Sequence, residues 1–249
     1  MKSAQELNSL ALSTRREWGE DDYSPIDIFA TVNGWKEKQI TLVSYPLSPR
    51  ISGMCTRVNK DTLICINSST SYGRQRFTLA HELYHVLYEK NMQRVICDMH
   101  MGDDKSDSEK EADLFAGYLL MPYDAMFQYA KKFTQWNLNT VIDAEQFFQI
   151  SHVAMLYRLE KDRFINHKTV EAFKECVISR EAAKLGYGKE LYMSLPQNKQ
   201  YFTTGEYIRK VEKLAEVEKI SNGKKEELLL DAFRADIVYN LDEEGSLND

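Results

Sequence analysis

The residues of this chain best suited to chemistry are two histidines and a glutamate in the run His81-Glu82-Leu83-Tyr84-His85. An HExxH pattern on a helix is typical of a zinc site, because neutral imidazoles are good zinc ligands. At about 100° per residue, the two histidines lie only about 40° apart on a helical wheel, one turn apart along the axis. Both imidazoles can therefore face a single ion.

The glutamate of this run has the position of a general base. Glu82 lies about 60° from His85 around the helix, where its carboxylate can reach a water on the metal without binding the metal itself. Zinc lowers the pKa of such a water toward about 7, and the carboxylate can pass the proton to a leaving amine. We therefore predict a catalytic Zn²⁺, with Mn²⁺ as an alternative ion, bound by His81 and His85.

A helix is expected to carry this motif over about residues 73–89. Its apolar residues recur at steps of three and four, as in an amphipathic helix; they are Leu79, Leu83, Val86 and Leu87. These side chains project away from the two histidines and should bury the helix against the core.

A catalytic zinc site needs a third protein ligand. A third histidine in the pattern HExxHxxGxxH is excluded, because Tyr88 and Asn91 occupy the Gly and His positions. A second amphipathic helix, expected over about residues 108–121, offers Glu109 and Glu111 instead. We predict Glu111 as the ligand, since it is in line with the apolar stripe of that helix. Glu109 lies about 160° away and is expected in solvent.

Four other side chains are candidates for supporting roles. His100 is an alternative metal ligand, in the polar loop before the second helix. Asp113 could accept a hydrogen bond from the outer nitrogen of a zinc-bound histidine, or be a plain surface residue. The hydroxyls of Tyr84 and Tyr72 are candidates to stabilise an oxyanion, although both tyrosines could serve only in packing.

Composition narrows the function classes. The 249 residues carry a net charge of −6 without a block of Lys and Arg, so direct nucleic-acid binding is not expected. There is neither a secretory signal nor an apolar run of the roughly 18 residues that span a bilayer, which predicts a cytoplasmic protein without a membrane partner. The widely spaced cysteines indicate buried or idle thiols rather than a disulfide framework; they are Cys55, Cys65, Cys97 and Cys176.

The elements around the motif predict an α+β fold that is mostly helical. Short runs rich in Ile, Val, Leu and Thr between residues 38 and 67 indicate a small antiparallel sheet. Helical patterns cover residues 3–18, the segment from Pro25 to Gly34, and most of the chain after Pro122. We predict a metallopeptidase domain over residues 1–165 and a C-terminal helical region over residues 166–249 that could dock a substrate or partner.

The tract RQRFTLAHELYHVLYEK, followed by SEKEADLFAGYLLMP, resembles the ImmA/IrrE metallopeptidases, and the likeness covers roughly residues 24–165. The resemblance implies a zincin-like domain with a gluzincin-like site. It places the family's HExxH on His81, Glu82 and His85, and the glutamate of its EAx(2)FA motif on Glu111.

The resemblance also implies a substrate. Family members are typically encoded beside a helix-turn-helix repressor and inactivate it by one proteolytic cut, often in phage or mobile-element regulation or in stress response. The alternative is a non-catalytic toxin–antitoxin or regulatory partner that retains its metal site. The intact Glu82 favours the enzyme, because a structural zinc site has four protein ligands and no use for a general base.

Overall fold

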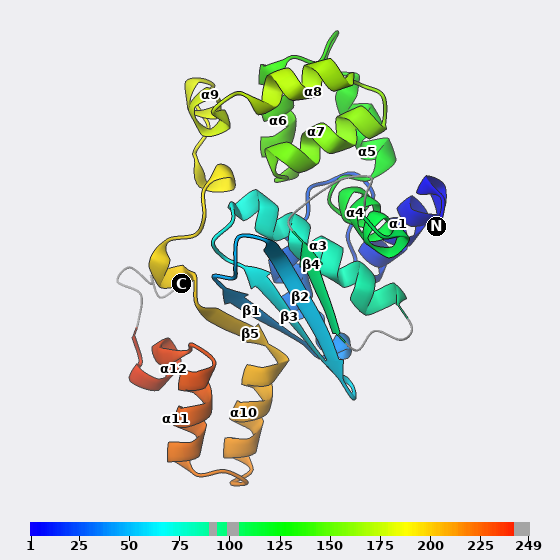
Figure 1. The fold of residues 1–249 in the computed structure, drawn as a ribbon. Helices are drawn as coiled ribbons and strands as arrows, with labels where there is room; N and C mark the ends of the chain where they lie inside the picture. Colours follow the sequence, from blue (N-terminus) through cyan, green and yellow to red (C-terminus); the bar gives the residue numbers. More distant parts are fainter. Residues whose placement is uncertain (90–93, 99–104, 242–249) are drawn as a thin grey trace.

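One mixed sheet lies at the centre of the computed structural model, which describes residues 1–89, 94–98 and 105–241 (Figure 1). The strands follow the order β4-β2-β3-β1-β5 across the sheet. Their bounds are β1 (Ile40–Tyr45), β2 (Ile51–Val58), β3 (Asp61–Asn67), β4 (Arg94–Asp98) and β5 (Phe202–Gly205). The predicted α+β class with a small sheet is confirmed.

The expectation of a purely antiparallel sheet is wrong. β2 and β3 form an antiparallel hairpin, but β1 runs parallel to β3, with Leu42 opposite Ile64. The connection between β1 and β2 contains Pro46 and Pro49, and it carries the chain past β3 instead of turning it straight back. β3 therefore lies between the two strands that precede it.

Helices make up most of the rest of the described residues. Their bounds are α1 (Ala4–Glu17), α2 (Ile28–Gly34), α3 (Tyr72–Tyr88), α4 (Asp107–Leu120), α5 (Tyr123–Ala130), α6 (Leu138–Phe148), α7 (His152–Lys161), α8 (His167–Lys174), α9 (Ile178–Lys184), α10 (Glu206–Glu216), α11 (Asn222–Asp231) and α12 (Ala235–Tyr239). The two helices predicted around the motif correspond to α3 and α4 within one residue at each end. No helix in these ranges is both long and apolar enough to cross a bilayer.

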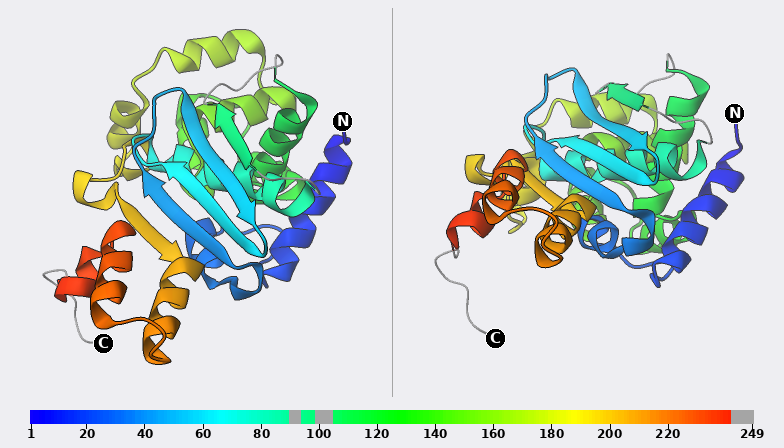
Figure 2. Two further views of the ribbon diagram at one scale, coloured as in Figure 1. Left: turned by 60° about the horizontal axis from the view of Figure 1, so that its bottom comes forward. Right: turned by 90° about the horizontal axis from the view of Figure 1, so that it is seen from below.

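α3 packs against β2 and β3, with α4 beside it and α1 next to α4 (Figures 1 and 2). Ser71 caps the start of α3, and Ser106 caps the start of α4 by accepting a hydrogen bond from the Glu109 amide at 3.3 Å. This cap fixes the first turn of α4, and with it the direction of the Glu109 side chain.

Two buried arginines fix the other end of α4. The last carbonyls of a helix lack partners within it and need donors from elsewhere. Arg15 of α1 donates from Nη1 to the carbonyl of Leu119 at 2.8 Å, and Arg158 of α7 donates to that of Met121 at 2.8 Å. α4 is thus held at both ends beside α3.

The C-terminal region also contributes to the sheet. β5 pairs antiparallel with β1, and α10 to α12 follow beyond that edge (Figure 2). Gly205 ends β5 at φ +92°, and a Cβ there would lie 2.3 Å from the Ile40 carbonyl oxygen, so the close approach requires glycine. Residues 166–249 are therefore not wholly helical, and the division at residue 165 stays a prediction.

Candidate metal centre

Two imidazoles and one carboxylate converge between α3 and α4. The Nε2 atoms of His81 and His85 are 3.3 Å apart. Glu109 lies between them, with Oε2 3.4 Å from His81 Nε2 and Oε1 3.2 Å from His85 Nε2. Both histidines are buried, whereas the Glu109 side chain is 21% exposed.

These separations fit a zinc ion. Nitrogen and oxygen ligands about 2.0 to 2.1 Å from a tetrahedral zinc lie roughly 3.3 to 3.4 Å from one another. The three distances of 3.2 to 3.4 Å match the edges of such a tetrahedron. The donor set of two imidazoles and a carboxylate is also one that catalytic zinc sites use.

The outer nitrogens of both histidines face carboxylates. Asp113 Oδ1 is 2.8 Å from His81 Nδ1, the contact anticipated for this residue, and Lys105 Nζ is 2.9 Å from Asp113 Oδ2. Glu89 Oε1 lies 3.1 Å from Nδ1 of His85. The hydrogen bond with Asp113 favours the His81 tautomer with the proton on Nδ1, which leaves its Nε2 lone pair directed at the site.

The pKa values of His81 and Glu109 depend on burial and on the short distances between the clustered side chains. Burial alone would lower the pKa of His81, but its hydrogen bonds with Asp113 and Glu109 outweigh burial and raise that pKa to about 9. Burial would raise the pKa of Glu109, but the two imidazoles lower it below its ordinary value. Without a metal, the site therefore favours a protonated histidine beside an ionised carboxylate, and a bound cation would replace that proton.

Asp113→Asn is expected to weaken zinc binding about 10- to 100-fold, because an amide is a poorer partner for the His81 Nδ1 proton. Competition with a chromogenic chelator measures the change. Asp124→Asn, an exposed carboxyl lost from α5, is the matched control and should leave the affinity unchanged. Equal affinities for the two variants would contradict a role of Asp113 in orienting the histidine.

The structure corrects the predicted third ligand. Glu111 is buried, as its position in the apolar stripe indicated, but it faces the start of α1 rather than the histidines. Its carboxylate accepts hydrogen bonds from the Lys2 backbone N–H and the Tyr84 hydroxyl, and Lys2 Nζ lies 2.8 Å from Oε2. An ammonium group, and not a metal, therefore compensates this buried charge. Glu109, expected in solvent, faces the imidazoles.

Glu111→Gln is expected to lower the free energy of unfolding by about 1 to 2 kcal/mol at neutral pH, through loss of charged hydrogen bonds. Although burial alone would raise the pKa of Glu111, the hydrogen bonds from Lys2 and Tyr84 lower it to about 2, against an ordinary value of 4.5. The contribution of ionised Glu111 to the free energy of unfolding is thus complete above pH about 4.5, and it is lost as pH falls toward 2. Urea unfolding at pH 7 and pH 3 should show a smaller difference at pH 3. A constant difference would contradict this ion pair.

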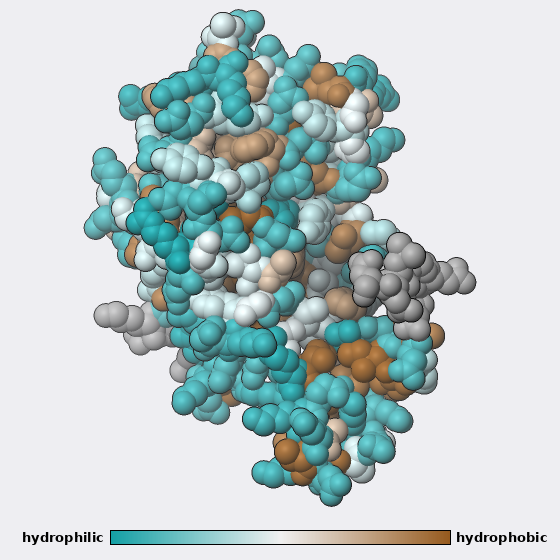
Figure 3. Space-filling model, turned by 180° about the vertical axis from the view of Figure 1, so that it is seen from behind, coloured by the Kyte–Doolittle hydropathy of each residue, from teal (hydrophilic) through white to brown (hydrophobic). Residues whose placement is uncertain are grey.

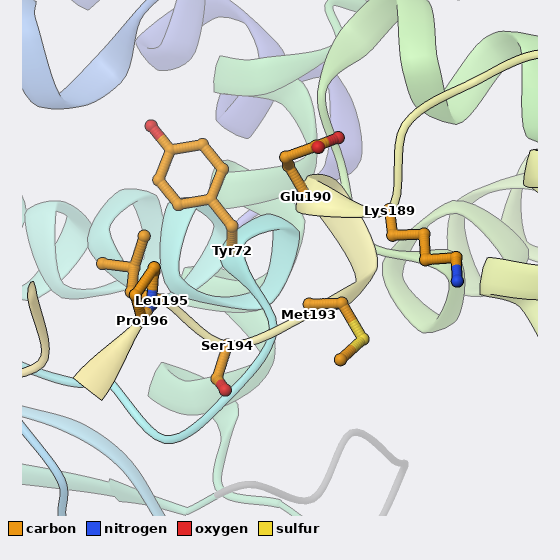
Figure 4. Close-up of a pocket in the computed structure, with 7 residues that line it drawn as sticks. All are labelled: Tyr72, Lys189, Glu190, Met193, Ser194, Leu195 and Pro196. Carbon is orange, nitrogen blue, oxygen red and sulfur yellow. The ribbon is translucent and has the colours of Figure 1, made fainter.

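Tyr84 and Tyr72, the candidates to stabilise an oxyanion, do not have their hydroxyls beside the clustered histidines and Glu109. The Tyr84 hydroxyl lies 2.6 Å from Lys2 Nζ and donates to Glu111. Tyr72 is the first residue of α3, about 13 to 14 Å along the axis from His81. It lines a separate pocket of about 380 Å³ together with six residues of the C-terminal region (Figure 4); they are Lys189, Glu190, Met193, Ser194, Leu195 and Pro196. Neither hydroxyl is placed to stabilise charge at this centre.

Glu82 points from α3 into the sheet, next to the histidines. It is fully buried, and neither carboxylate oxygen receives an N–H or O–H hydrogen bond within the described residues. A Cβ on Gly53 of β2 would lie 3.0 Å from its Oε1, so glycine leaves room for the carboxylate. Burial raises the pKa of Glu82, against the opposing effects of His81 and of the neighbouring Cys97 and Cys55 thiols. A raised pKa suits a group that takes up and releases a proton.

Cys97, on β4, is a further potential donor at the centre. Its thiol is buried, as expected, but it is not remote from the chemistry, because Sγ lies 3.9 Å from Glu109 Oε1. The donor atoms of His81, His85, Cys97 and Glu109 all lie within 4.8 Å of one another. His100, the alternative ligand, lies outside the described residues.

The fold and this cluster define a zincin-like metallopeptidase domain. Residues 40–160 match the model of the peptidase M78 family, described as an IrrE N-terminal-like domain. This segment contains the HExxH helix and α4, and the resemblance to ImmA/IrrE metallopeptidases is confirmed. A search among curated proteins finds no match to the chain.

Proposed function

We propose that this protein is a zinc-dependent endopeptidase with His81, His85 and Glu109 as its metal ligands. One observation carries the proposal: two imidazole nitrogens and a carboxylate converge at 3.2 to 3.4 Å from one another, on the helix that also bears a buried glutamate. The match of residues 40–160 to the model of a peptidase family supports the same reaction class.

The protein's side chains divide the work of peptide hydrolysis. Zinc, when bound, polarises the scissile carbonyl and makes water more acidic. Glu82 takes a proton from the attacking water and delivers it to the leaving amine. Asp113 holds the His81 ring by its Nδ1–H, so that this ring keeps its orientation during turnover.

For the substrate, we propose a helix-turn-helix regulator encoded near this protein, encountered in the cytosol. The support is the family resemblance, whose members cut such repressors once. The C-terminal region offers a surface for such a partner, because Figure 3 shows hydrophobic side chains gathered at this end of the molecule. Exposed apolar residues of the region include Phe202 of β5, Leu230 of α11 and Phe233 just after it.

The test is to incubate the full-length, zinc-loaded protein with the helix-turn-helix regulator from the neighbouring reading frame. We expect two products from a single cut, identified by intact-mass measurement. The cut should be absent after chelation and return when zinc is added. A regulator that stays intact with zinc-loaded protein would contradict this substrate, and cleavage that resists chelation would contradict a metal-dependent reaction.

A second candidate function, a non-catalytic interaction protein with a structural metal, is favoured by Cys97. With this thiol the centre offers four donors, the number that a closed structural zinc site uses. The presence of Glu82 beside the donors argues against this alternative, because a closed site needs no proton acceptor.

A further inference from the structure

The fourth donor of the centre comes from an edge strand. β4 pairs antiparallel with β2, and the register places Cys97 opposite Gly53, whose missing side chain leaves room for Glu82. The Cys97 side chain is fully buried, between the carboxylates of Glu82 and Glu109. This environment is unusual for a thiol that serves only in packing.

The distance of Cys97 from the other donors suits coordination. Zinc–sulfur bonds are about 2.3 Å long, so a sulfur lies roughly 3.5 to 3.6 Å from nitrogen and oxygen ligands in a tetrahedral site. Cys97 Sγ is 3.9 Å from Glu109 Oε1, and its separation from each of the other donor atoms is within 4.8 Å. Four-coordination therefore requires Cys97 Sγ to approach the other donors more closely than it does in this structure.

We propose that Cys97 is a fourth, displaceable ligand that closes the metal centre in the resting protein. The inference rests on the proposed function and adds regulation to it. On binding, the S–H bond breaks, a metal–sulfur bond forms and the proton leaves to the buffer. The thiolate would then compete with the attacking water for its position on the metal. In this latent state cleavage is slow, and it reaches its full rate when Cys97 moves away.

The position of β4 makes this displacement feasible. Among the described strands β4 lies at the edge of the sheet and pairs with β2 alone, so releasing Cys97 requires only this ladder to shift. His81, His85 and Glu109 come from α3 and α4. The metal therefore keeps three ligands when the thiolate leaves, which is the ligand number of a catalytic zinc site.

Cobalt spectroscopy on the full chain tests the ligand. Wild type loaded with one Co²⁺ should show a thiolate-to-cobalt charge-transfer band in the near ultraviolet. Cys97→Ser and Cys97→Ala should lose the band yet keep the visible d–d bands. Cys55→Ser is the matched control, since Cys55 is equally buried and also neighbours Glu82, and it should keep the band. Circular dichroism checks that each variant is folded.

The outcomes separate this inference from the proposed function. One Co²⁺ bound to wild type without a thiolate band would overturn ligation by Cys97. Wild type that binds no stoichiometric Co²⁺, or whose binding survives His81→Ala, would instead overturn the metal centre itself.

Regulation is tested by the rate of regulator cleavage at equal zinc content. Cys97→Ala should cleave at least about tenfold faster than wild type, because water gains access to a three-ligand site. Equal rates, including equal absence of cleavage, would overturn the latent state even if the cobalt band shows that Cys97 is a ligand.

Discussion

Glu82→Gln is expected to reduce peptide-bond cleavage by roughly 10²- to 10⁴-fold while the protein stays folded and binds one zinc. Glutamine has nearly the shape of glutamate, but it cannot take the proton of the attacking water. Because Glu82 lies beside the donors and is not one of them, the metal content should not change. Initial rates of regulator cleavage, normalised to zinc measured by mass spectrometry, give the effect.

The control for this variant is Glu111→Gln, which makes the same chemical change in another buried carboxyl. Since Glu111 pairs with Lys2 and Tyr84, its loss should affect stability and leave the cleavage rate per folded molecule near that of wild type. Cleavage by zinc-loaded Glu82→Gln at more than about a tenth of the wild-type rate would remove Glu82 from the reaction.

The second large effect is on metal binding. Loss of a residue that hydrogen-bonds a metal ligand, such as Asp113, weakens zinc binding about 10- to 100-fold. Glu109→Gln is expected to weaken it more, because a charged ligand becomes a neutral amide. The Glu109 carboxylate also lies close to both imidazoles, with oxygens 3.2 and 3.4 Å from their Nε2 atoms. Zinc retained after dialysis, and affinity from chelator competition, measure the loss.

Comparison with Glu111→Gln decides between the two glutamates of α4. The geometry predicts that Glu111→Gln keeps wild-type zinc affinity, although it unfolds more readily. The reverse result, with zinc lost from Glu111→Gln and kept by Glu109→Gln, would show that the N-terminal segment moves aside and that the assignment from the sequence was correct.

Local periodicity predicted much of the fold. α3 and α4 lie within one residue of their expected bounds, and Ser151 caps α7 by accepting from the Ala154 amide at 3.4 Å. These elements depend on capping residues and on apolar spacing, both of which are local. The sequence also predicted that His81 and His85 face one site, because both lie on one helix and are one turn apart.

The choice of Glu111 over Glu109 shows what the helical wheel of one helix cannot predict. Glu111 is in line with the apolar stripe of α4 and therefore points into the protein. However, side chains of α4 that point into the protein can meet either the histidines of α3 or the start of α1. A second hypothesis indicated the other glutamate. Asp113 was a candidate to accept a hydrogen bond from a zinc-bound histidine, with a plain surface position as the alternative, and it is four residues, or about 40°, from Glu109. From Glu111 it is about 160° away. Glu109 and Asp113 therefore share a face, and the two predictions together favour Glu109.

The two missed strands are short and depend on distant partners. β5 is the four-residue run FTTG, which forms a strand by pairing with β1 more than 150 residues earlier. β4 pairs with β2, with Met54 opposite Ile96, and this pairing brings Cys97 to the centre. Residue type and spacing showed a buried thiol, but only the tertiary fold shows that it lies beside a carboxylate of α4.

The most direct measurement is anomalous diffraction at the zinc edge from crystals of the zinc-loaded protein. The account predicts one peak between α3 and α4, within about 2.0 to 2.2 Å of the His81 and His85 Nε2 atoms and a Glu109 oxygen. A peak bound to Glu111 instead of Glu109, or zinc found only at other sites, would contradict the metal centre proposed for this protein.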